Sequence, residues 1–469
     1  MTRKISFIVI ILLQFSSPVF ADNSIVSKSD GIGDITLTVY NYDIAFISEL
    51  RNIELPSGRV ELTFYDIPSS IIPASARLEA LDGTGKLSLI ENRYEYDLSD
   101  ELKLSSKYVG KEVKLLFIDP VTGRESTKDA TLLKPGRKPV LRIGKDIVFD
   151  MPGKILYPPL SDDVFGAPAI IWVLDNGSEG PRLLRTTYLA RSISWEANHT
   201  LMLSQDESSA DLSSTVTMYN SSGMNFLNAK LILIAGEINL ETGSAESEIS
   251  YSKPMSREAD VIEEKVFEYY SYELERRYDL MNEERKNLMF RRFSDVPLVK
   301  KFFIEGDEAL YFSQYRQGVA RGSAGVMLEL KNGVDSGIGK PLPAGIIRVY
   351  KEDSGGRVQF VGEDRIEHSP PGELIRIRTG SAFDIVTERK QTDWLRIAEG
   401  VFESSIEVKI RNYKNEDVVI TVIEPVPGDW MVLKTSHDFR KTSSDVLEFD
   451  IGVPAGKEAV LDYRIRVIL

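Results

Sequence analysis

One short charged run holds the side chains best suited to acid–base chemistry. Residues 362–368 read Gly-Glu-Asp-Arg-Ile-Glu-His. In a strand, Asp364, Ile366 and His368 would share one face, which places a carboxylate near an imidazole. Such a pair can exchange a proton or contribute to a metal site. The candidate acids and bases are Asp364, Glu367, His368 and, as a second carboxylate farther along the chain, Glu388.

A second charged run, 388–394, reads Glu-Arg-Lys-Gln-Thr-Asp-Trp. If the two runs form a hairpin, their charges would pair as crossed salt bridges, each contributing on the order of 0–1 kcal/mol. Both interpretations, an ion-paired surface and a catalytic site, stay open at this point. Trp195 could stack on a sugar or fill a core. The candidate binding residues are Trp195, Arg365, Arg389, Lys390 and Asp393.

Several chemistries are excluded or unsupported by the residues present. The chain has no cysteine, which rules out thiol nucleophiles and thiolate metal sites, and only three histidines. The run 337–340 has the wrong spacing for a phosphate loop, and Pro341 stands where Ser or Thr would bind magnesium. Residues 250–253 match S-x-x-K but lack its companion motifs. We expect no metal site and no cofactor, with loop-stiffening calcium bound by carboxylates as the alternative.

The first residues predict export from the cytoplasm. Arg3 and Lys4 precede an apolar run, Ile5–Phe15. Residues of small or modest size then occupy the positions that a signal peptidase reads, of which the last is Ala21. This is the pattern of a secretory signal peptide cleaved near Ala21, and it is too short to span a bilayer. We therefore expect an extracytoplasmic protein, periplasmic or secreted, with no transmembrane segment in the mature chain.

The charge balance limits the class of partner. The formal net charge is −14. Because phosphate neutralisation needs clustered Lys and Arg, we expect no nucleic-acid partner. The acidic balance instead favours solubility.

Period-two alternation of apolar and polar residues recurs along most of the chain, for example over 35–40, 212–219 and 460–467. Gly, Pro, Asn, Asp and Ser separate these runs, as turns require. The pattern predicts an all-β protein of serial antiparallel β-sandwich (immunoglobulin-like) domains with little helix. The expected divisions are a signal peptide at 1–21, an N-terminal β domain at 22–165, a central β domain at 166–398 and a C-terminal sandwich unit at 399–469.

Two further patterns suggest that one β unit is repeated. A Pro-x-Gly phrase precedes a strand pattern at 55–58, 342–345 and 453–456, which indicates one turn used three times. The runs 212–220 and 405–412 each end in Asn, and each is expected to return as a hairpin. The segment 257–292 fits a helical stripe and a strand alternation equally well.

The mature chain resembles the secreted bacterial family described as domain of unknown function 4139. The resemblance is carried by Pro341–Tyr350, Phe360–His368, Ala382–Gln391 and Glu424–Trp430, and by Val39–Asn41, Leu55–Gly58, Ser194–Ala197 and Asn225–Gly236. It implies an all-β extracytoplasmic protein and no particular activity. It also implies that 274–280 and 285–290 form a hairpin. This sequence differs from some relatives in lacking their long coiled-coil arm.

Two hypotheses about function follow. The first is a non-enzymatic binding or structural module of the bacterial envelope, with an unknown envelope protein or glycan as its partner. The alternative is a hydrolase acting on envelope polymers through the carboxylates and His368. Two carboxylates about 5–10 Å apart across a cleft would favour the hydrolase. Carboxylates paired with arginines on an open sheet would not.

Overall fold

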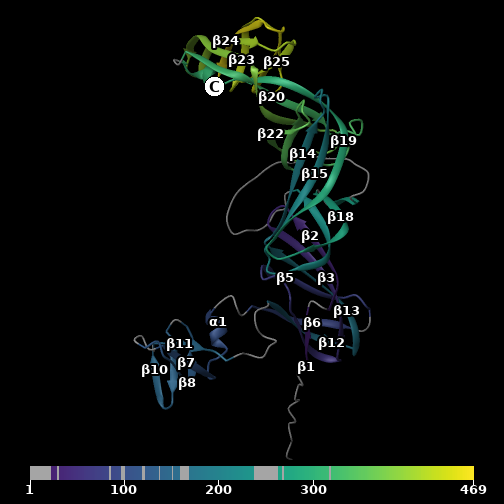
Figure 1. The fold of residues 1–469 in the computed structure, drawn as a ribbon, viewed down its shortest axis with the longest axis vertical. Helices are drawn as coiled ribbons and strands as arrows, with labels where there is room; N and C mark the ends of the chain where they lie inside the picture. Colours follow the sequence, from purple (N-terminus) through teal and green to yellow (C-terminus); the bar gives the residue numbers. More distant parts are fainter. Residues whose placement is uncertain are drawn as a thin grey trace, which may run out of the picture. The chain divides into compact units, whose positions relative to one another are not determined.

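The computed structural model of the chain describes residues 23–28, 31–83, 86–96, 101–118, 122–136, 138–149, 152–158, 168–236, 262–266, 269–315 and 318–469. The expected signal peptide at 1–21 and the S-x-x-K match at 250–253 lie outside these residues. The described part is almost entirely strand, with the short helices α1 (Glu101–Ser106) and α2 (Ala309–Phe312) (Figure 1). The all-β prediction is confirmed. None of the helices in the described part has the length and apolar character needed to cross a membrane.

The strands form four sheets, and antiparallel pairing predominates among them. Parallel pairs are present too, namely β1–β4, β14–β21 and β19–β25. In spatial order the first sheet contains β1 (Asn23–Ser27), β4 (Gly58–Phe64), β12 (Ala169–Asn176) and β6 (Leu87–Glu95). The second contains β17 (Ile262–Val266), β18 (Tyr269–Leu280), β16 (Phe226–Ala235), β2 (Ile32–Tyr40), β3 (Ile44–Leu55), β13 (Gly180–Arg191) and β5 (Ile71–Ala80).

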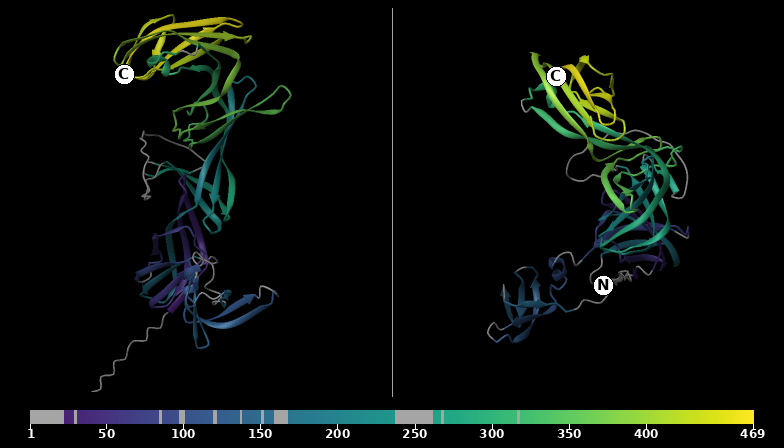
Figure 2. Two further views of the ribbon diagram at one scale, coloured as in Figure 1. Left: turned by 90° about the vertical axis from the view of Figure 1, so that its left-hand side faces the viewer. Right: turned by 45° about the horizontal axis from the view of Figure 1, so that its top comes forward.

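A small third sheet, drawn in blue in Figure 2, lies next to α1 in the sequence. Its strands are β10 (Asp146–Phe149), β9 (Val140–Ile143), β8 (Glu125–Lys134), β7 (Glu112–Ile118) and β11 (Lys154–Leu156). The fourth and largest sheet contains β22 (Val358–Ile366), β21 (Gly345–Glu352), β14 (Ile193–Leu203), β15 (Ser209–Asn220), β19 (Glu284–Glu305), β20 (Val319–Lys331), β23 (Leu374–Ala398), β24 (Val401–Asn412), β29 (Glu458–Ile468) and β26 (Asp429–Thr435). Beside it, β25 (Val418–Pro425) pairs with β19 and β28 (Val446–Val453), and β27 (Phe439–Lys441) pairs with β28.

The described residues divide into two compact units: unit 1 takes them from 1–37, 45–192 and 221–229, and unit 2 from 38–44, 193–220 and 230–469. The expected division at 22–165, 166–398 and 399–469 stays a prediction. Within unit 2, β23 and β24 pair with each other across the last of those boundaries.

Unit 1 is held by sheets packed face to face. Arg51 of β3 is fully buried, and its guanidinium lies over the ring of Phe64 on β4, 4.5 Å from the ring centroid. The same guanidinium donates to Glu49 (2.8 Å), and Glu49 accepts the hydroxyl of Tyr188 (2.8 Å). A buried charge is stable only when it is paired and hydrogen-bonded in this way. The network therefore marks the interior between two sheets.

Unit 2 contains two apolar clusters joined by long strands. One cluster includes Leu298, Leu328 and Ile377, and the other includes Phe302, Ala324 and Ile385. β19 has 22 residues and β23 has 25, so each strand contributes side chains to both clusters. At about 3.3 Å per residue, each of these strands is on the order of 70–80 Å long. Each long strand therefore runs through both apolar clusters of unit 2.

The expected hairpins are wrong, because their strands join different partners. β15 pairs with β14 and β19, whereas β16 lies between β18 and β2. β24 pairs with β23 and β29, whereas β25 pairs with β19 and β28. The segment expected as a hairpin at 274–290 forms β18 and β19, which are strands but also belong to different sheets. Each turn is therefore a corner at which two consecutive strands separate and join different partners, in two of the three cases in different sheets.

A buried asparagine fastens three strand ends in the same way. In each case the residue is the last of a strand or directly follows it, and its side-chain amide donates to two successive carbonyl oxygens of a remote x-Pro-x-Gly turn. Buried donors and acceptors need such partners, so each bond set ties two corners together. The bonds are Asn176 to Leu55 (3.4 Å) and Pro56 (2.9 Å), Asn332 to Ser369 (2.9 Å) and Pro370 (3.2 Å), and Asn412 to Val453 (3.1 Å) and Pro454 (3.3 Å).

The third copy of this turn is at 369–372, not at 342–345 as the sequence pattern suggests. Gly58, Gly372 and Gly456 have φ values of 93°, 99° and 65°, in the region that favours glycine. Gly345 does not have a positive φ and instead begins β21, with its Cα close to the backbone of Ala197. The Pro343 turn is contacted by histidines rather than by asparagine.

Candidate functional site

The charged run 362–368 lies at the end of β22, the outermost strand of the large sheet. Glu363 accepts from Arg348 on the neighbouring strand at 3.1 Å. Asp364 accepts the backbone N–H groups of Arg365 (2.8 Å) and Arg378 (2.7 Å). These contacts engage the carboxylates in binding the chain's own groups. Arg365 and Glu367 are exposed.

Two of the three histidines brace one turn. His368 Nδ1 accepts the backbone N–H of Ala344 at 3.1 Å. His199 Nε2 lies 3.0 Å from the carbonyl oxygen of Pro343, and its Nδ1 lies 2.7 Å from Ser214 Oγ. Because a carbonyl oxygen only accepts, Nε2 of His199 donates and Nδ1 accepts from the serine hydroxyl.

His199 is a structural residue that the sequence reasoning did not single out. It is fully buried, and burial lowers its pKa from 6.5 to about 4, against the opposing effect of the bond to Pro343. The ring is therefore neutral at physiological pH. The available signal was the alternation of 193–203, in which every odd-numbered residue is buried.

Glu388 is clamped between two arginines. Arg411 donates both terminal nitrogens to its two oxygens at 3.2 Å, and Arg321 Nε lies 3.1 Å from Oε1. The hydrogen bonds from Arg411 are the main cause of the lowered pKa of this carboxyl. A carboxylate held ionised in this way is a poor proton donor. Its ion pairs run to β20 and β24 and not to the 362–368 run.

The remaining binding candidates divide between core and surface. Trp195 is 2% exposed and donates from Nε1 to the carbonyl oxygen of Ile234 at 3.3 Å, so its ring cannot stack on a ligand in this conformation. Arg389 faces the interior, whereas its neighbour Lys390 is exposed. Asp393 is exposed and accepts from Arg464 at 2.7 Å.

Arg389 belongs to a buried network in the C-terminal cluster of unit 2. Its Nη1 lies 2.5 and 2.6 Å from the two oxygens of Glu424, which is 0% exposed. Tyr311 of α2 donates to Glu424 (2.8 Å) and lies 2.8 Å from the hydroxyl of Tyr463. Burial favours the neutral state of Arg389, but Glu424 outweighs it and raises the pKa. This network repeats the Glu–Arg–Tyr chemistry of unit 1.

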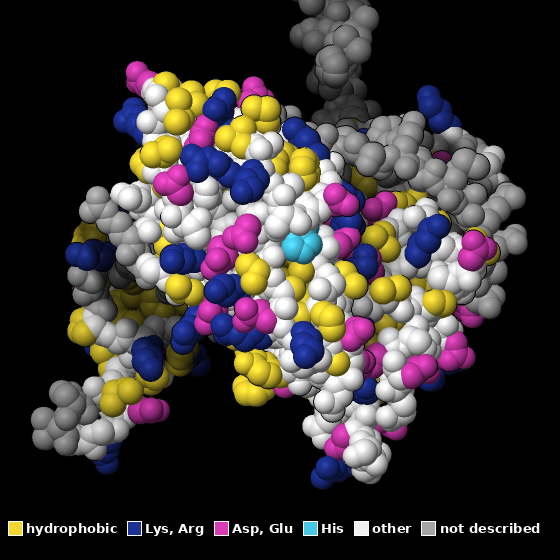
Figure 3. Space-filling model, turned by 90° about the horizontal axis from the view of Figure 1, so that it is seen from above, with side chains coloured by type: hydrophobic (Ala, Val, Ile, Leu, Met, Phe, Trp, Pro, Cys, Tyr) yellow, Lys and Arg dark blue, Asp and Glu magenta, His cyan; other side chains and the backbone are white. Residues whose placement is uncertain are grey.

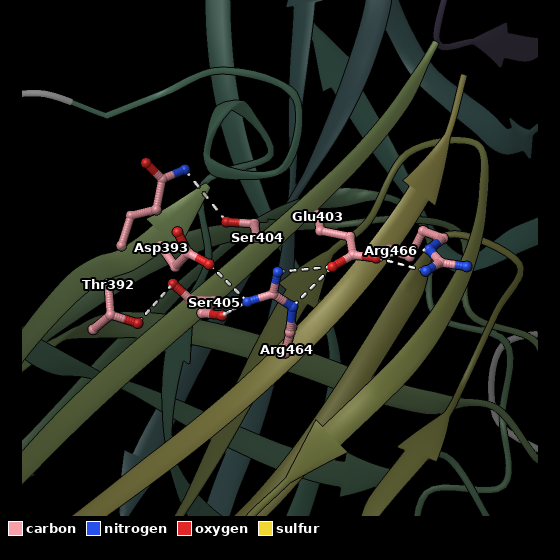
Figure 4. Close-up of polar contacts among 8 residues, drawn as sticks. Thr392, Asp393, Glu403, Ser404, Ser405, Arg464 and Arg466 are labelled. Carbon is pink, nitrogen blue, oxygen red and sulfur yellow. Dashed lines mark hydrogen bonds and ion pairs between the residues drawn. The ribbon is translucent and has the colours of Figure 1, made fainter. Parts of the chain in front are cut away.

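The outward face of β23, β24 and β29 carries a ladder of ion pairs. Figure 4 shows Arg464 between Asp393 and Glu403, with Arg466 on the other side of Glu403. Arg464 lies 2.7 Å and Arg466 2.6 Å from Glu403, whose pKa these arginines lower, Arg466 most. The prediction that the runs 362–368 and 388–394 pair with each other is wrong, because Glu388 and Asp393 form their ion pairs with arginines of β20, β24 and β29. Figure 3 shows the same mixture of acidic and basic side chains over one face.

A hollow of about 550 Å³ lies elsewhere on this sheet, where β20 and β23 meet the residue that follows β24. Phe383 is 90% exposed and Tyr413 is 64% exposed, which is unusual for aromatic rings in a folded protein. The hollow is open to solvent. Its lining consists of Arg321, Gly322, Ser323, Phe383, Asp384, Val386 and Tyr413.

A β-bulge turns Phe383 outward. Ser323 of β20 pairs with Val386, but the next residue, Ala324, pairs with Ala382, so 383–385 have no partners on β20. A bulge of this type re-aims side chains and is common next to binding sites. The backbone remains bonded, because Tyr413 donates its N–H to the carbonyl oxygen of Asp384 at 2.8 Å. The sequence reasoning missed Phe383 and Tyr413, since nothing local in the sequence signals a bulge.

The described residues contain no group of three or more His, Asp and Glu side chains arranged to hold a metal ion. The fold and these surfaces define an all-β, cysteine-free, multi-layer sandwich protein. No protein-family model matches the chain. No curated protein matches it at a significant level.

Proposed function

We propose that this protein is a non-enzymatic binding module of the bacterial envelope, exported by its leader and related to the family described as domain of unknown function 4139. The proposal rests on one observation above all. An exposed aromatic pair, Phe383 and Tyr413, borders an open hollow on a rigid sheet. Recognition residues on a rigid scaffold lose little conformational entropy when a partner binds.

The alternative, a hydrolase, receives no support from the carboxylates it needs. Glu388 is ion-paired on an open sheet face, and Asp364 binds backbone N–H groups. The arginines lower the pKa of Glu388, whereas a general acid needs a raised pKa. The ion pairs of Glu388 instead link β23 to β20 and β24 across the sheet.

An affinity experiment tests the binding role. The mature protein, immobilised, is incubated with detergent-solubilised bacterial envelope, alongside the double variant Phe383→Ala/Tyr413→Ala. We expect the wild type to retain envelope components that the double variant loses. Phe149→Ala is the matched control, because Phe149 is 72% exposed but belongs to the small third sheet. Equal retention by wild type and double variant would refute a role for the hollow.

Export is tested separately. The full-length chain is expressed in a Gram-negative host, and the periplasmic fraction is examined by intact-mass spectrometry. We expect a species whose mass corresponds to loss of residues 1–21. A cytoplasmic, uncleaved chain would contradict the localisation without bearing on the hollow.

A further inference from the structure

We propose that the hollow at Phe383 and Tyr413 binds a neutral oligosaccharide. This inference rests on the proposed binding function and specifies its ligand. It begins with the two rings, which are 90% and 64% exposed in one hollow. Exposed rings leave apolar area in water, and the C–H face of a sugar ring covers such area while its hydroxyls stay solvated.

The polar groups of the hollow suit a ligand that both donates and accepts. Asp384 is exposed and its side chain forms no hydrogen bond or ion pair with the described residues, so its carboxylate can accept from hydroxyls. Arg321 is 77% exposed and uses Nε for Glu388, leaving its terminal nitrogens as donors. Ser323 and the Tyr413 hydroxyl can do either.

The charges of the hollow favour a neutral ligand. Its lining has one acidic side chain, Asp384, and one basic side chain, Arg321. Beyond this lining, Glu388 and Arg411 form an ion pair with each other. An anionic or cationic polymer would gain attraction from one of these groups and meet repulsion from the other. A polyhydroxy compound without charge avoids the repulsion and uses both as hydrogen-bonding groups.

The strand order argues against a peptide added to the sheet. Peptides bind β proteins most readily by pairing with an exposed edge strand. β23 lies between β20 and β24, so its backbone has partners on both sides. Residues 319–324 of β20 pair with β23 alone, because the pairing of β20 with β19 ends at Gly325, and their open edge is the side away from β23. Where β20 pairing lapses at 383–385, Ile385 still pairs with Asn412 and Asp384 accepts from Tyr413. The hollow therefore offers side chains, which is how sugars are recognised, and not a backbone template.

The test is isothermal titration calorimetry of the purified mature protein with uncharged oligomers of glucose, of mannose and of N-acetylglucosamine. We expect at least one oligomer to bind and the monomer to bind more weakly. Phe383→Ala should weaken binding about tenfold, the size expected of one aromatic contact, while Phe383→Tyr should stay close to wild type. Phe149→Ala should bind like wild type.

Fold integrity is checked by the unfolding midpoint, which should not change for Phe383→Ala because the ring is 90% exposed. If none of the three oligomers binds at millimolar concentration, the inference is overturned. If envelope capture still depends on Phe383 in that case, and the captured species is a protein, the binding function stands and only the ligand class is wrong. If the double variant captures glycan and protein as well as the wild type does, both the binding function of the hollow and the proposed ligand class are overturned.

Discussion

Asn412 donates a hydrogen bond from Nδ2 to the carbonyl oxygen of Val453 at 3.1 Å, across 41 residues of sequence. The same amide reaches Pro454 at 3.3 Å and Glu416 at 2.8 Å. Equivalent bonds are made by Asn176 and Asn332 to their own Pro-Gly turns. At each of the three places, one side-chain amide thus joins the end of a strand to a turn remote in the sequence.

Asn412→Ala should destabilise unit 2. The substitution removes the donor from three carbonyl oxygens in a buried place, and the loss is expected to be roughly 2–4 kcal/mol. Urea unfolding followed by circular dichroism measures it. Asn415→Ala, at an exposed position in the adjacent turn, is the control and should change stability by less than about 0.5 kcal/mol. Equal effects for the two variants would contradict the fastening role.

Removing one partner of the buried pair Arg389–Glu424 should be costly. Glu424→Gln leaves the guanidinium without a counter-charge in the interior, and a loss of roughly 3–5 kcal/mol is expected. Arg389→Leu combined with Glu424→Leu should be less destabilising than Glu424→Gln, because no buried charge remains. A double-mutant cycle by chemical denaturation measures the coupling. Additive losses would show that the two side chains do not depend on each other.

Glu403 should behave differently although arginines also hold it. The Glu403 side chain is only 9% exposed, but Arg464 and Arg466 are 27% and 40% exposed, so water reaches the guanidinium side of each pair and screens the attraction. Glu403→Gln should therefore cost no more than about 1 kcal/mol at low salt. At about 1 M salt, where the screening length is about 3 Å, the difference from wild type should vanish. A large loss that persists in high salt would show that this pair acts as a buried one.

His199 predicts a specific dependence of stability on acid. Its pKa in the folded protein, about 4, lies below the unfolded value of 6.5, so the unfolded chain binds the extra proton first. The neutral ring stabilises the fold fully above pH 6.5. This contribution is lost as the pH falls from 6.5 to 4 and then levels off, for a total of roughly 3 kcal/mol.

The measurement compares the unfolding free energy of wild type and His199→Gln at several pH values between 7 and 4. The variant starts less stable but should lose less stability over this range, since it has no ring to protonate. Parallel curves for His199→Gln and wild type would refute the assignment. The comparison of slopes separates His199 from carboxylates that titrate in both proteins.

The sequence alone determined the fold class and much of the local strand pattern. Alternation over 193–203 predicts a strand with one buried face, and β14 buries every odd-numbered residue in that range. Alternation predicts only which residues of a strand face the core. It can do so from the local sequence because residues two positions apart in a strand lie on the same face. For the same reason Asp364 and Ile366 fall on one face as expected, while Glu363 and Arg365 fall on the other, exposed one.

Only the tertiary structure decided which strands meet. A turn such as 221–225 can return its strand to the same sheet or send it to another, and the local residues are compatible with both outcomes. The choice follows from packing between remote segments, as when Asn412 reaches Val453 or Arg389 reaches Glu424. The same long-range packing buries Arg389 in the interior of unit 2 and exposes Phe383 at a β-bulge. Burial of apolar area and pairing of buried polar groups act through space, so these positions could not be derived from spacing along the chain.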